Sequence, residues 1–299
     1  MKVFLTGASG VMGRSAMTAL VDAGHEVVGL ARSDEAAQVV RDHGAEPRPG
    51  SIFDRESLVR AMRRCDAVLN FASHAPVGHA MVRPGAWRAG DRIRRLGSLA
   101  VSDAAVRTGI GLLVQQSRSA LYADAGDAWI DEHHPVAISR ATDAIADAEQ
   151  HARFVQRHGG HAVVLRFGLV TGTDPASRWM VRRARSGRPT GWGEPRSWVH
   201  LVHGDDVGPA VVAALGAPAG TYNVGAAPCR REDLAEQLAL AGGRRGGRFH
   251  NAATQRLARH RLEIYTRSQR VSSQRFADRT GWHPQFPKLT PEWFDGVDA

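Results

Sequence analysis

Cysteine, lysine and tyrosine are scarce in this chain of 299 residues, which holds two cysteines, three tyrosines and only Lys2 and Lys288 as lysines. Cys65 and Cys229 lie far apart and show no metal-ligand spacing, so we expect a reduced, cytoplasmic protein with no disulfide and no bound metal. No apolar run approaches the roughly 20 residues that span a bilayer. The apolar stretch after Met1 is also too short for a signal peptide, and we expect no membrane association.

Acidic charge is also in short supply, because 39 basic residues face 30 acidic ones and leave a net charge of +9. Almost all of the basic residues are arginines, and they are scattered among acids instead of forming one stripe. Aromatic residues make up 6% of the chain, too few to suggest a surface on which bases stack. We therefore expect no nucleic-acid binding and favour a basic pocket for an anionic small molecule.

The first half of the chain alternates short apolar runs with amphipathic stretches, as repeated βαβ units require. Strands this apolar, with helices between them, predict a parallel sheet that is covered on both faces. The expected strands lie at 2–7, 25–31, 66–72, 111–117 and 161–168, and the expected helices at 11–23, 34–42, 54–63, 92–107 and 139–158.

After Gly168 this alternation breaks into a stretch rich in Gly, Pro, Arg and Trp, and a helix and a strand return at 205–224. The pattern predicts a dinucleotide-binding lobe from residues 1–170, to which 199–225 return. Residues 171–198 and 226–299 would then form a smaller substrate-binding cap.

A glycine-rich turn, "TGASGVMG", follows the first strand and precedes the first helix. Gly7, Gly10 and Gly13 have no Cβ, so the backbone can bend tightly and approach a pyrophosphate. The helix that follows offers unpaired N–H groups and the positive end of its dipole. We predict a dinucleotide site here. Its contact residues would be Gly7, Ser9, Gly10, Val11, Met12 and Gly13.

The end of the second strand bears on which dinucleotide binds. NAD sites usually place an acidic residue there, whereas this chain has Ala31 followed by Arg32. An arginine can pair with the 2′-phosphate of NADP through its planar fork. We therefore prefer NADP(H) over NAD(H), with the alternative that Arg32 is one of the many solvated surface arginines of the chain.

Several segments together resemble the extended short-chain dehydrogenase/reductases, a group often described as NAD-dependent epimerase/dehydratases. They are "TGASGVMG", "GSIFDRESL" at 50–58, "VLNFASHAP" and "VVLRFGLVTG" at 163–172. The resemblance implies an α/β fold: a Rossmann-type doubly wound parallel sheet with a small C-terminal substrate-binding cap. It also implies a homodimer as one assembly to test. Residues at matching positions would face the cofactor: Ile52, Phe71, Ala72, Phe167 and Gly168.

The family's usual catalytic pair is missing. That chemistry uses a tyrosine and, four residues on, a lysine that lowers the tyrosine's pKa for proton transfer. If Glu149 is taken as the family's acidic residue in this helix, Ala141 and Ile145 stand at the two catalytic positions. Independently of that alignment, no tyrosine or lysine occurs between residues 123 and 221.

The fifth-strand motif is altered as well, in "QQSRSALYAD". Tyr122 resembles the family's strand-end tyrosine, and Arg118 then takes the usual serine or threonine position. Arg118 stays charged and is a poor proton donor, but it could hold a carboxylate or a developing oxyanion. It could also pair with an acid such as Asp131 or Glu132. The candidate catalytic residues are Ser117, Arg118 and Tyr122.

Three functions are compatible with a cofactor turn that lacks the catalytic pair. The first is an NADP-linked oxidoreductase that acts on a small metabolite, acidic metabolites included, and uses a non-standard proton donor. The second is a non-redox isomerase, lyase or cyclase on the same scaffold. The third is a binding protein that senses NADP(H).

Overall fold

The computed structural model describes residues 1–297, apart from the side chains of 257–261. Its centre is a seven-stranded sheet in the order β11-β7-β5-β4-β1-β2-β3, in which every pair of neighbours is parallel. The strands are β1 (Lys2–Thr6), β2 (Glu26–Ala31), β3 (Glu46–Pro49), β4 (Ala67–Asn70), β5 (Leu112–Arg118), β7 (His161–Phe167) and β11 (Gly220–Val224).

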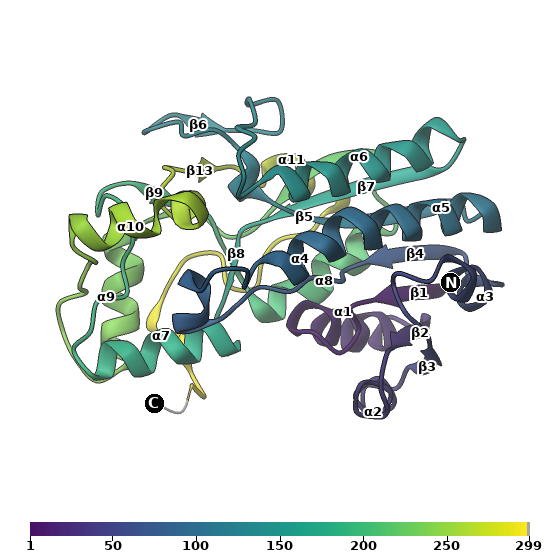
Figure 1. Cartoon of the computed structure of the whole chain (residues 1–299), viewed down its shortest axis with the longest axis horizontal. Coiled ribbons are helices and arrows are strands. Elements are labelled where there is room, and N and C mark those ends of the chain that lie inside the picture. The colour runs from purple at the N-terminus through teal and green to yellow at the C-terminus, as the bar shows by residue number, and fades with distance from the viewer. Residues whose placement is uncertain (298–299) are drawn as a thin grey trace.

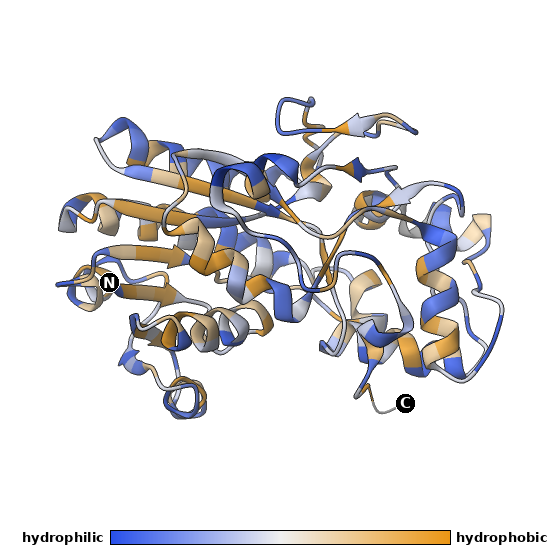
Figure 2. Cartoon of the chain, turned by 180° about the vertical axis from the view of Figure 1, so that it is seen from behind, coloured by the Kyte–Doolittle hydropathy of each residue, from blue (hydrophilic) through white to orange (hydrophobic). Residues whose placement is uncertain are grey.

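Helices cover both faces of this sheet, because its central strands are apolar on both sides and must be buried on both (Figures 1 and 2). One face packs on α1 (Val11–Asp22) and α8 (Gly204–Ala214), and α2 (Asp34–Asp42) adds Val40 to the same core. The other face packs on α3 (Arg55–Met62), α5 (Ser98–Thr108) and α6 (Asp143–Arg157). The predicted α/β class and doubly wound parallel sheet are confirmed.

A smaller group of elements lies beside the carboxyl-terminal edge of the sheet (Figure 1). Val181, Leu238 and Trp293 are the centre of its own apolar cluster. Its helices are α7 (Pro175–Arg185), α9 (Arg231–Ala241) and α10 (Ala252–Leu262). Three two-stranded pairings lie between it and the lobe. They are β8 (Leu169–Thr171) with β10 (Leu201–His203), β9 (Trp198–Val199) with β12 (Cys229–Arg230), and β6 (Trp129–Ile130) with β13 (Arg270–Val271).

Helix α11 (Gln274–Thr280) falls in the stretch 226–299 that the sequence assigned to the cap, but it packs on β11 of the large sheet. Phe276 is buried in the same core cluster as Tyr222 and Trp282. The chain therefore returns to the lobe a second time, because Phe276 finds its apolar partners there. Within residues 1–297, no helix combines the length and the apolarity that crossing a membrane requires.

Candidate functional site

The glycine turn at the end of β1 has the geometry of a backbone cradle. Gly7 adopts φ 71°, and a Cβ added to it would lie 2.5 Å from the carbonyl oxygen of Phe71. A Cβ on Gly13 would lie 2.1 Å from the carbonyl oxygen of Gly7, so α1 could not approach the turn as closely. Gly10 is exposed at the open side, where its amide donates to the Gly7 carbonyl at 2.9 Å. Both packing and backbone conformation therefore require glycine here.

The first turn of α1 is left open to an anion. Its N-cap, Gly10, supplies no side-chain acceptor, and no acidic residue stands in the first turn. The leading amides of a helix have no partner within the helix, and they carry the positive end of its dipole. Gly7, Gly10 and Gly13, together with the amides of Val11 and Met12, thus fit a dinucleotide pyrophosphate, with Ser9 partly exposed at the rim.

Arg32 stands directly after β2, at the same edge of the sheet as the glycine turn. Its side chain is exposed, and it makes no hydrogen bond or ion pair with another residue in the described part of the chain. The preceding Ala31 is buried and has no group that could bind ribose hydroxyls. The guanidinium is therefore available to a negatively charged group at this edge.

The other predicted cofactor residues lie around the same strand ends. Ile52 is partly exposed and packs against Gly97, and Ala72 donates its amide to Thr6 Oγ1 at 3.3 Å. Phe71 and Phe167 are buried and meet edge to face, with ring centroids 6.0 Å apart. Their rings are therefore enclosed in the core at the strand ends, and a direct contact with a cofactor stays a prediction. Gly168 lets the chain cross Leu201, whose carbonyl carbon would lie 2.7 Å from an added Cβ.

Ser117 is engaged in a buried ion-pair network. Its hydroxyl donates to Glu149 Oε1 at 2.6 Å, and the Arg166 guanidinium donates to both Glu149 oxygens at 2.8 and 2.7 Å. All three side chains are buried. Glu149, on α6, thus fastens this helix to β5 and β7, and Ser117 belongs to that fastening. In the sequence, Glu149 served only to align this helix with the family, and no role was predicted for it.

Tyr122 is buried as well. Its hydroxyl donates to Asn223 Oδ1 at 2.7 Å, and the Arg166 guanidinium lies 4.7 Å from its ring centroid. Burial, which outweighs the nearby Arg166 charge, raises the pKa of Tyr122 to about 12. A phenol that is enclosed and hard to ionise is suited to packing, and the inclusion of Tyr122 among the candidate catalytic residues stays a prediction.

Arg118 is the partly exposed member of the predicted catalytic set, at the carboxyl end of β5. Neither acid proposed as its partner binds it: Asp131 accepts from the His133 amide, and Glu132 accepts from the Asn223 amide at 2.8 Å. Its guanidinium instead lies 6.0 Å from the ring centroid of Tyr265, which comes from the short helix η4 (Glu263–Tyr265) of the cap.

Arg94 also lies at this end of the sheet, and sequence reasoning missed it. It belongs to a single π-helical turn, η2 (Ile93–Gly97), between α4 (Arg88–Arg92) and α5. Burial, and then the like charge of Arg118, lower the pKa of Arg94 to about 10, whereas Asp91 and Tyr265 act in the opposite direction. One arginine among 39 basic residues carries no positional signal in the sequence, but π-turns often mark functional sites.

The two positions of the missing catalytic pair lie at the start of α6. Ile145 is buried in packing, and Ala141 precedes the first turn and is partly exposed. Neither side chain can exchange a proton. That proton chemistry at this edge needs another donor stays a prediction from the sequence.

A buried histidine stands behind the end of β5. The ring Nδ1 of His200 lies 3.0 Å from Ser119 Oγ, and its Nε2 lies 3.4 Å from Ser273 Oγ. Burial lowers the pKa of His200 to about 3. It is therefore neutral at physiological pH, and it links the lobe to the C-terminal segment as a hydrogen-bonding group.

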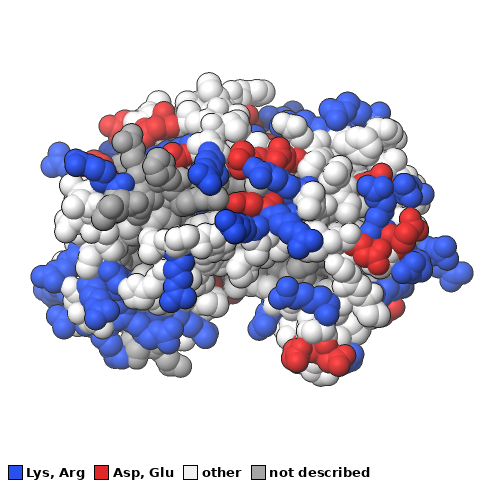
Figure 3. Space-filling model, viewed as in Figure 1, with Lys and Arg blue, Asp and Glu red and all other residues white. Residues whose placement is uncertain are grey.

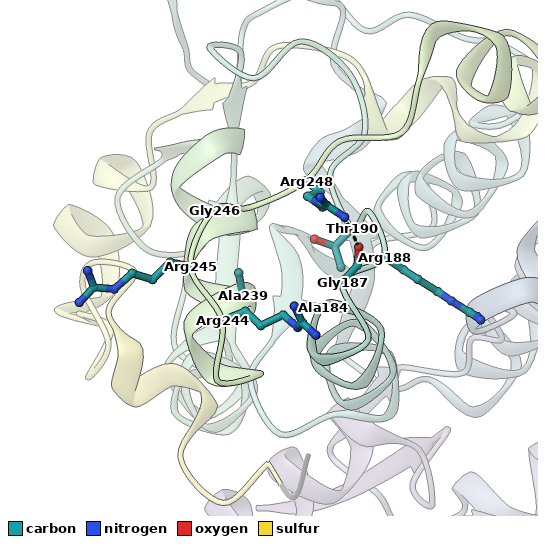
Figure 4. A pocket seen from close by; sticks show the side chains of 9 residues that line it. All are labelled: Ala184, Gly187, Arg188, Thr190, Ala239, Arg244, Arg245, Gly246 and Arg248. Atoms are coloured by element: carbon teal, nitrogen blue, oxygen red, sulfur yellow. Dashed lines mark hydrogen bonds between the residues drawn. The ribbon is translucent and has the colours of Figure 1, made fainter.

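A separate cavity of about 130 Å³ lies in the cap between the ends of α7 and α9. Figure 3 shows basic side chains gathered over this region, at the lower left, and Figure 4 shows Arg188 and Arg245 pointing away from each other beside the cavity. Two of the arginines at this cavity already have hydrogen-bond partners in the protein. Arg244 donates to the carbonyl of Arg185, and Arg248 donates to the carbonyl of Gly187 at 2.7 Å. They close the end of α7.

The glycine cradle and the parallel sheet agree with what comparison with known proteins finds. A family model, the NAD dependent epimerase/dehydratase family, matches residues 3–225, well over half of the chain. The chain belongs to this family. The resemblance stated from the sequence motifs is thereby confirmed.

Curated relatives match over part of their length. A ketoreductase of Stigmatella aurantiaca, which acts on a farnesylated dihydroquinoline oxide by its name, is 35% identical over 58% of this chain and 52% of its own. A UDP-glucose 4-epimerase of Azospirillum brasilense is 32% identical over 59% of this chain and 51% of its own. The chain thus spans about half the length of these two relatives, and about a quarter of an uncharacterized protein of Schizosaccharomyces pombe that it also matches.

Solved structures share the fold at low identity. A Thermus thermophilus UDP-glucose 4-epimerase in complex with NAD aligns with a TM-score of 0.76 at 23% identity, over 95% of this chain and 94% of that one. A Bifidobacterium longum UDP-glucose 4-epimerase, in complex with NAD+ and UDP, aligns with a TM-score of 0.75 at 16% identity, over 98% and 96% of the two chains.

Proposed function

We propose that this protein is an NAD(P)-dependent oxidoreductase that reduces a carbonyl of a small, anionic metabolite or oxidises the matching alcohol. The observation that carries the proposal is the glycine cradle, in which Gly7 and Gly13 leave no room for a Cβ and the first turn of α1 carries no acid. A ketoreductase among the partial relatives supports the redox direction. A bound nicotinamide would supply or accept the hydride.

NADP(H) is the preferred cofactor in this proposal. Arg32 is exposed after β2 and makes no ion pair with a described residue, which leaves its fork for a 2′-phosphate. Neighbouring structures with bound NAD show that the same fold also serves NAD in other proteins. The preference therefore depends on this side chain of this chain.

The test is a calorimetric titration of the purified protein with NADPH and NADH, followed by absorbance assays of NADPH oxidation with carbonyl compounds. We expect NADPH to bind about tenfold more tightly than NADH. Absence of affinity for both dinucleotides would refute the proposal. If no NADPH is oxidised with any of many classes of carbonyl compound, its redox part is refuted.

A non-redox isomerase, lyase or cyclase is the second candidate, and the replacement of the family's catalytic positions by Ala141 and Ile145 favours it. In this case the bound dinucleotide keeps its oxidation state while the substrate changes. Stoichiometric consumption of NADPH would eliminate this candidate, and substrate conversion at constant NADPH absorbance would eliminate the first.

A homodimer through the helices that flank the sheet is part of the proposal. Leu96 and Leu99, beside and on α5, are 54% and 41% exposed, so they offer two apolar side chains at the outer surface for a second copy of the chain. Light scattering should give twice the monomer mass of 32.3 kDa, and the double variant L96E/L99E should give the monomer mass.

A further inference from the structure

Three side chains from three separate segments converge at the carboxyl end of β5. Arg118 ends that strand, Arg94 comes from the π-turn η2, and Tyr265 comes from η4 of the cap. Arg118 contacts the Tyr265 ring, and Arg94 lies close enough to Arg118 for their charges to interact. The glycine cradle ends β1, which is separated from β5 only by β4, so the two features share one edge of the sheet at roughly 10 Å.

The two guanidinium groups are not neutralised by a direct partner in the protein. Neither forms a hydrogen bond or an ion pair with any residue that the structure describes, and both are partly exposed. Burial, and then the like charge of Arg118, lower the pKa of Arg94 against the opposing effect of Asp91 and Tyr265, so two like charges held together at this partly buried place are unfavourable. Such an arrangement becomes favourable when an anion lies between the charges, and a planar carboxylate fits the arginine fork.

The structure also fixes this arrangement in place. Gly90 lies against Arg94, because a Cβ there would be 3.2 Å from Arg94 Nη1 and 2.2 Å from the carbonyl oxygen of His74. On the cap side, Arg267 donates to the carbonyls of Ala120 and Tyr122 at 3.0 and 3.1 Å.

The same arginine, Arg267, donates to Glu263 at 3.1 Å, and Ser139 also donates to Glu263. Glu263 begins η4, so these bonds fasten the segment that carries Tyr265 to the end of β5.

We propose, building on the oxidoreductase function above, that Arg94 and Arg118 hold the carboxylate of a small oxo acid while Tyr265 supplies the proton that the family tyrosine supplies elsewhere. A bound nicotinamide would supply the hydride for the new C–H bond. As the π electrons of the C=O bond move to oxygen, Tyr265 gives that oxygen its phenolic proton. Water then returns a proton to Tyr265. The tyrosine comes from the cap and not from α6, so the cap supplies part of the site.

The binding test uses the complex with NADP+ and five 2-oxo acids of increasing side-chain size, from glyoxylate to phenylglyoxylate, each beside its uncharged methyl ester, and inorganic phosphate. We expect calorimetry to show at least one acid bound at least tenfold more tightly than its ester. Arg94→Gln and Arg118→Gln should each remove that preference. Arg95→Gln, in the same π-turn but paired with Asp143 and Asp147 at 2.6 and 3.0 Å, should keep it.

A preference for no acid over its ester, or binding of phosphate alone, would overturn the carboxylate site. Because dinucleotide binding is measured first, these outcomes leave the proposed function standing, whereas failure of the dinucleotide to bind refutes that function itself.

The proton donor is tested by turnover of the best-bound acid with NADPH. Tyr265→Phe should lower kcat by about 100-fold or more while the dissociation constant of the acid changes less than about threefold. Tyr222→Phe is the matched control, since the Tyr222 hydroxyl donates to the Pro218 carbonyl at 2.8 Å in the core. An unchanged kcat in Tyr265→Phe, or no turnover of any bound acid by the wild type, would overturn the role of Tyr265.

Discussion

The ends of β1 and β5 lie at one edge of the same sheet, yet they are built in opposite ways. At β1 the site consists of missing side chains, since Gly7, Gly10 and Gly13 expose backbone. At β5 it consists of long side chains, with Arg118 beside the Tyr265 ring of the cap and Arg94 near enough to Arg118 for their charges to interact. A Cβ on Gly7 or Gly13 would lie 2.5 or 2.1 Å from a backbone carbonyl oxygen, so these two positions tolerate no side chain. A proton donor, in contrast, can be supplied from any segment that reaches the place.

The largest effect is expected at the β5 end, from the loss of its buried ion pair. Glu149→Ala leaves the Arg166 charge buried without its carboxylate, which should lower the free energy of unfolding by about 3–5 kcal/mol in urea denaturation. Glu56→Ala, which removes an exposed pair with Arg107, should change it by less than about 1 kcal/mol. If Glu149→Ala folds with unchanged stability but loses turnover, Glu149 takes part in the reaction and does not serve only to hold α6 against the sheet.

The β1 end should respond in ligand affinity. Gly10→Ala places a Cβ at the exposed side of the turn, 3.2 Å from the Gly7 carbonyl oxygen, where a pyrophosphate would approach. We expect about 100-fold weaker NADPH binding, or about 2.7 kcal/mol, in a calorimetric titration. Gly111→Ala is the control, because a Cβ at Gly111 has no atom within 4 Å. Equal affinities in the two variants would contradict the cradle.

Lowering the pH should reduce the free energy of unfolding, because His200 is buried behind the end of β5 without a proton. Its pKa is about 3 in the folded protein, against 6.5 for an unperturbed histidine, so the unfolded chain takes up a proton first as the pH falls through 6.5. The stability that the neutral ring contributes is thus lost below pH 6.5, by about 2 kcal/mol at pH 5. Unfolding curves of the wild type and His200→Asn at pH 7 and pH 5 measure this difference. Parallel losses in both proteins would exclude His200 as the cause.

The smallest effect concerns the choice of dinucleotide. Arg32→Ala should weaken NADPH binding about tenfold, or about 1.4 kcal/mol, and leave NADH binding within about twofold. Arg41→Ala, on the exposed side of α2 where it bonds to Gln38 at 3.0 Å, should leave both unchanged. A loss of NADH affinity equal to that of NADPH would show that Arg32 does not contact a 2′-phosphate.

Much of the lobe could be predicted from local patterns. Apolar strands and amphipathic helices gave the parallel sheet, and the spacing of Gly7, Gly10 and Gly13 gave the cradle, because both depend on residues close together in the chain. The packing of α11 on β11 could not be predicted in this way, since the choice between lobe and cap depends on Phe276 meeting Tyr222 across the fold.

In the candidate site, too, local patterns predict some features and contacts across the fold decide the others. Ser117 and Tyr122 match the family pattern by position, but only the fold shows that the first binds Glu149 and the second Asn223. Arg94 and Tyr265 are ordinary residues in sequence, 171 positions apart (265 minus 94), and they acquire a shared neighbour in Arg118 only when the cap returns to the sheet.

By itself, the sequence determined the family, the glycine turn and the absence of the tyrosine–lysine pair, because each of these is a matter of residue type and short spacing. Only the tertiary structure decided which side chains are enclosed and which stand together at the end of β5. Burial and charge proximity are properties of distances in space, and segments far apart in the chain set those distances.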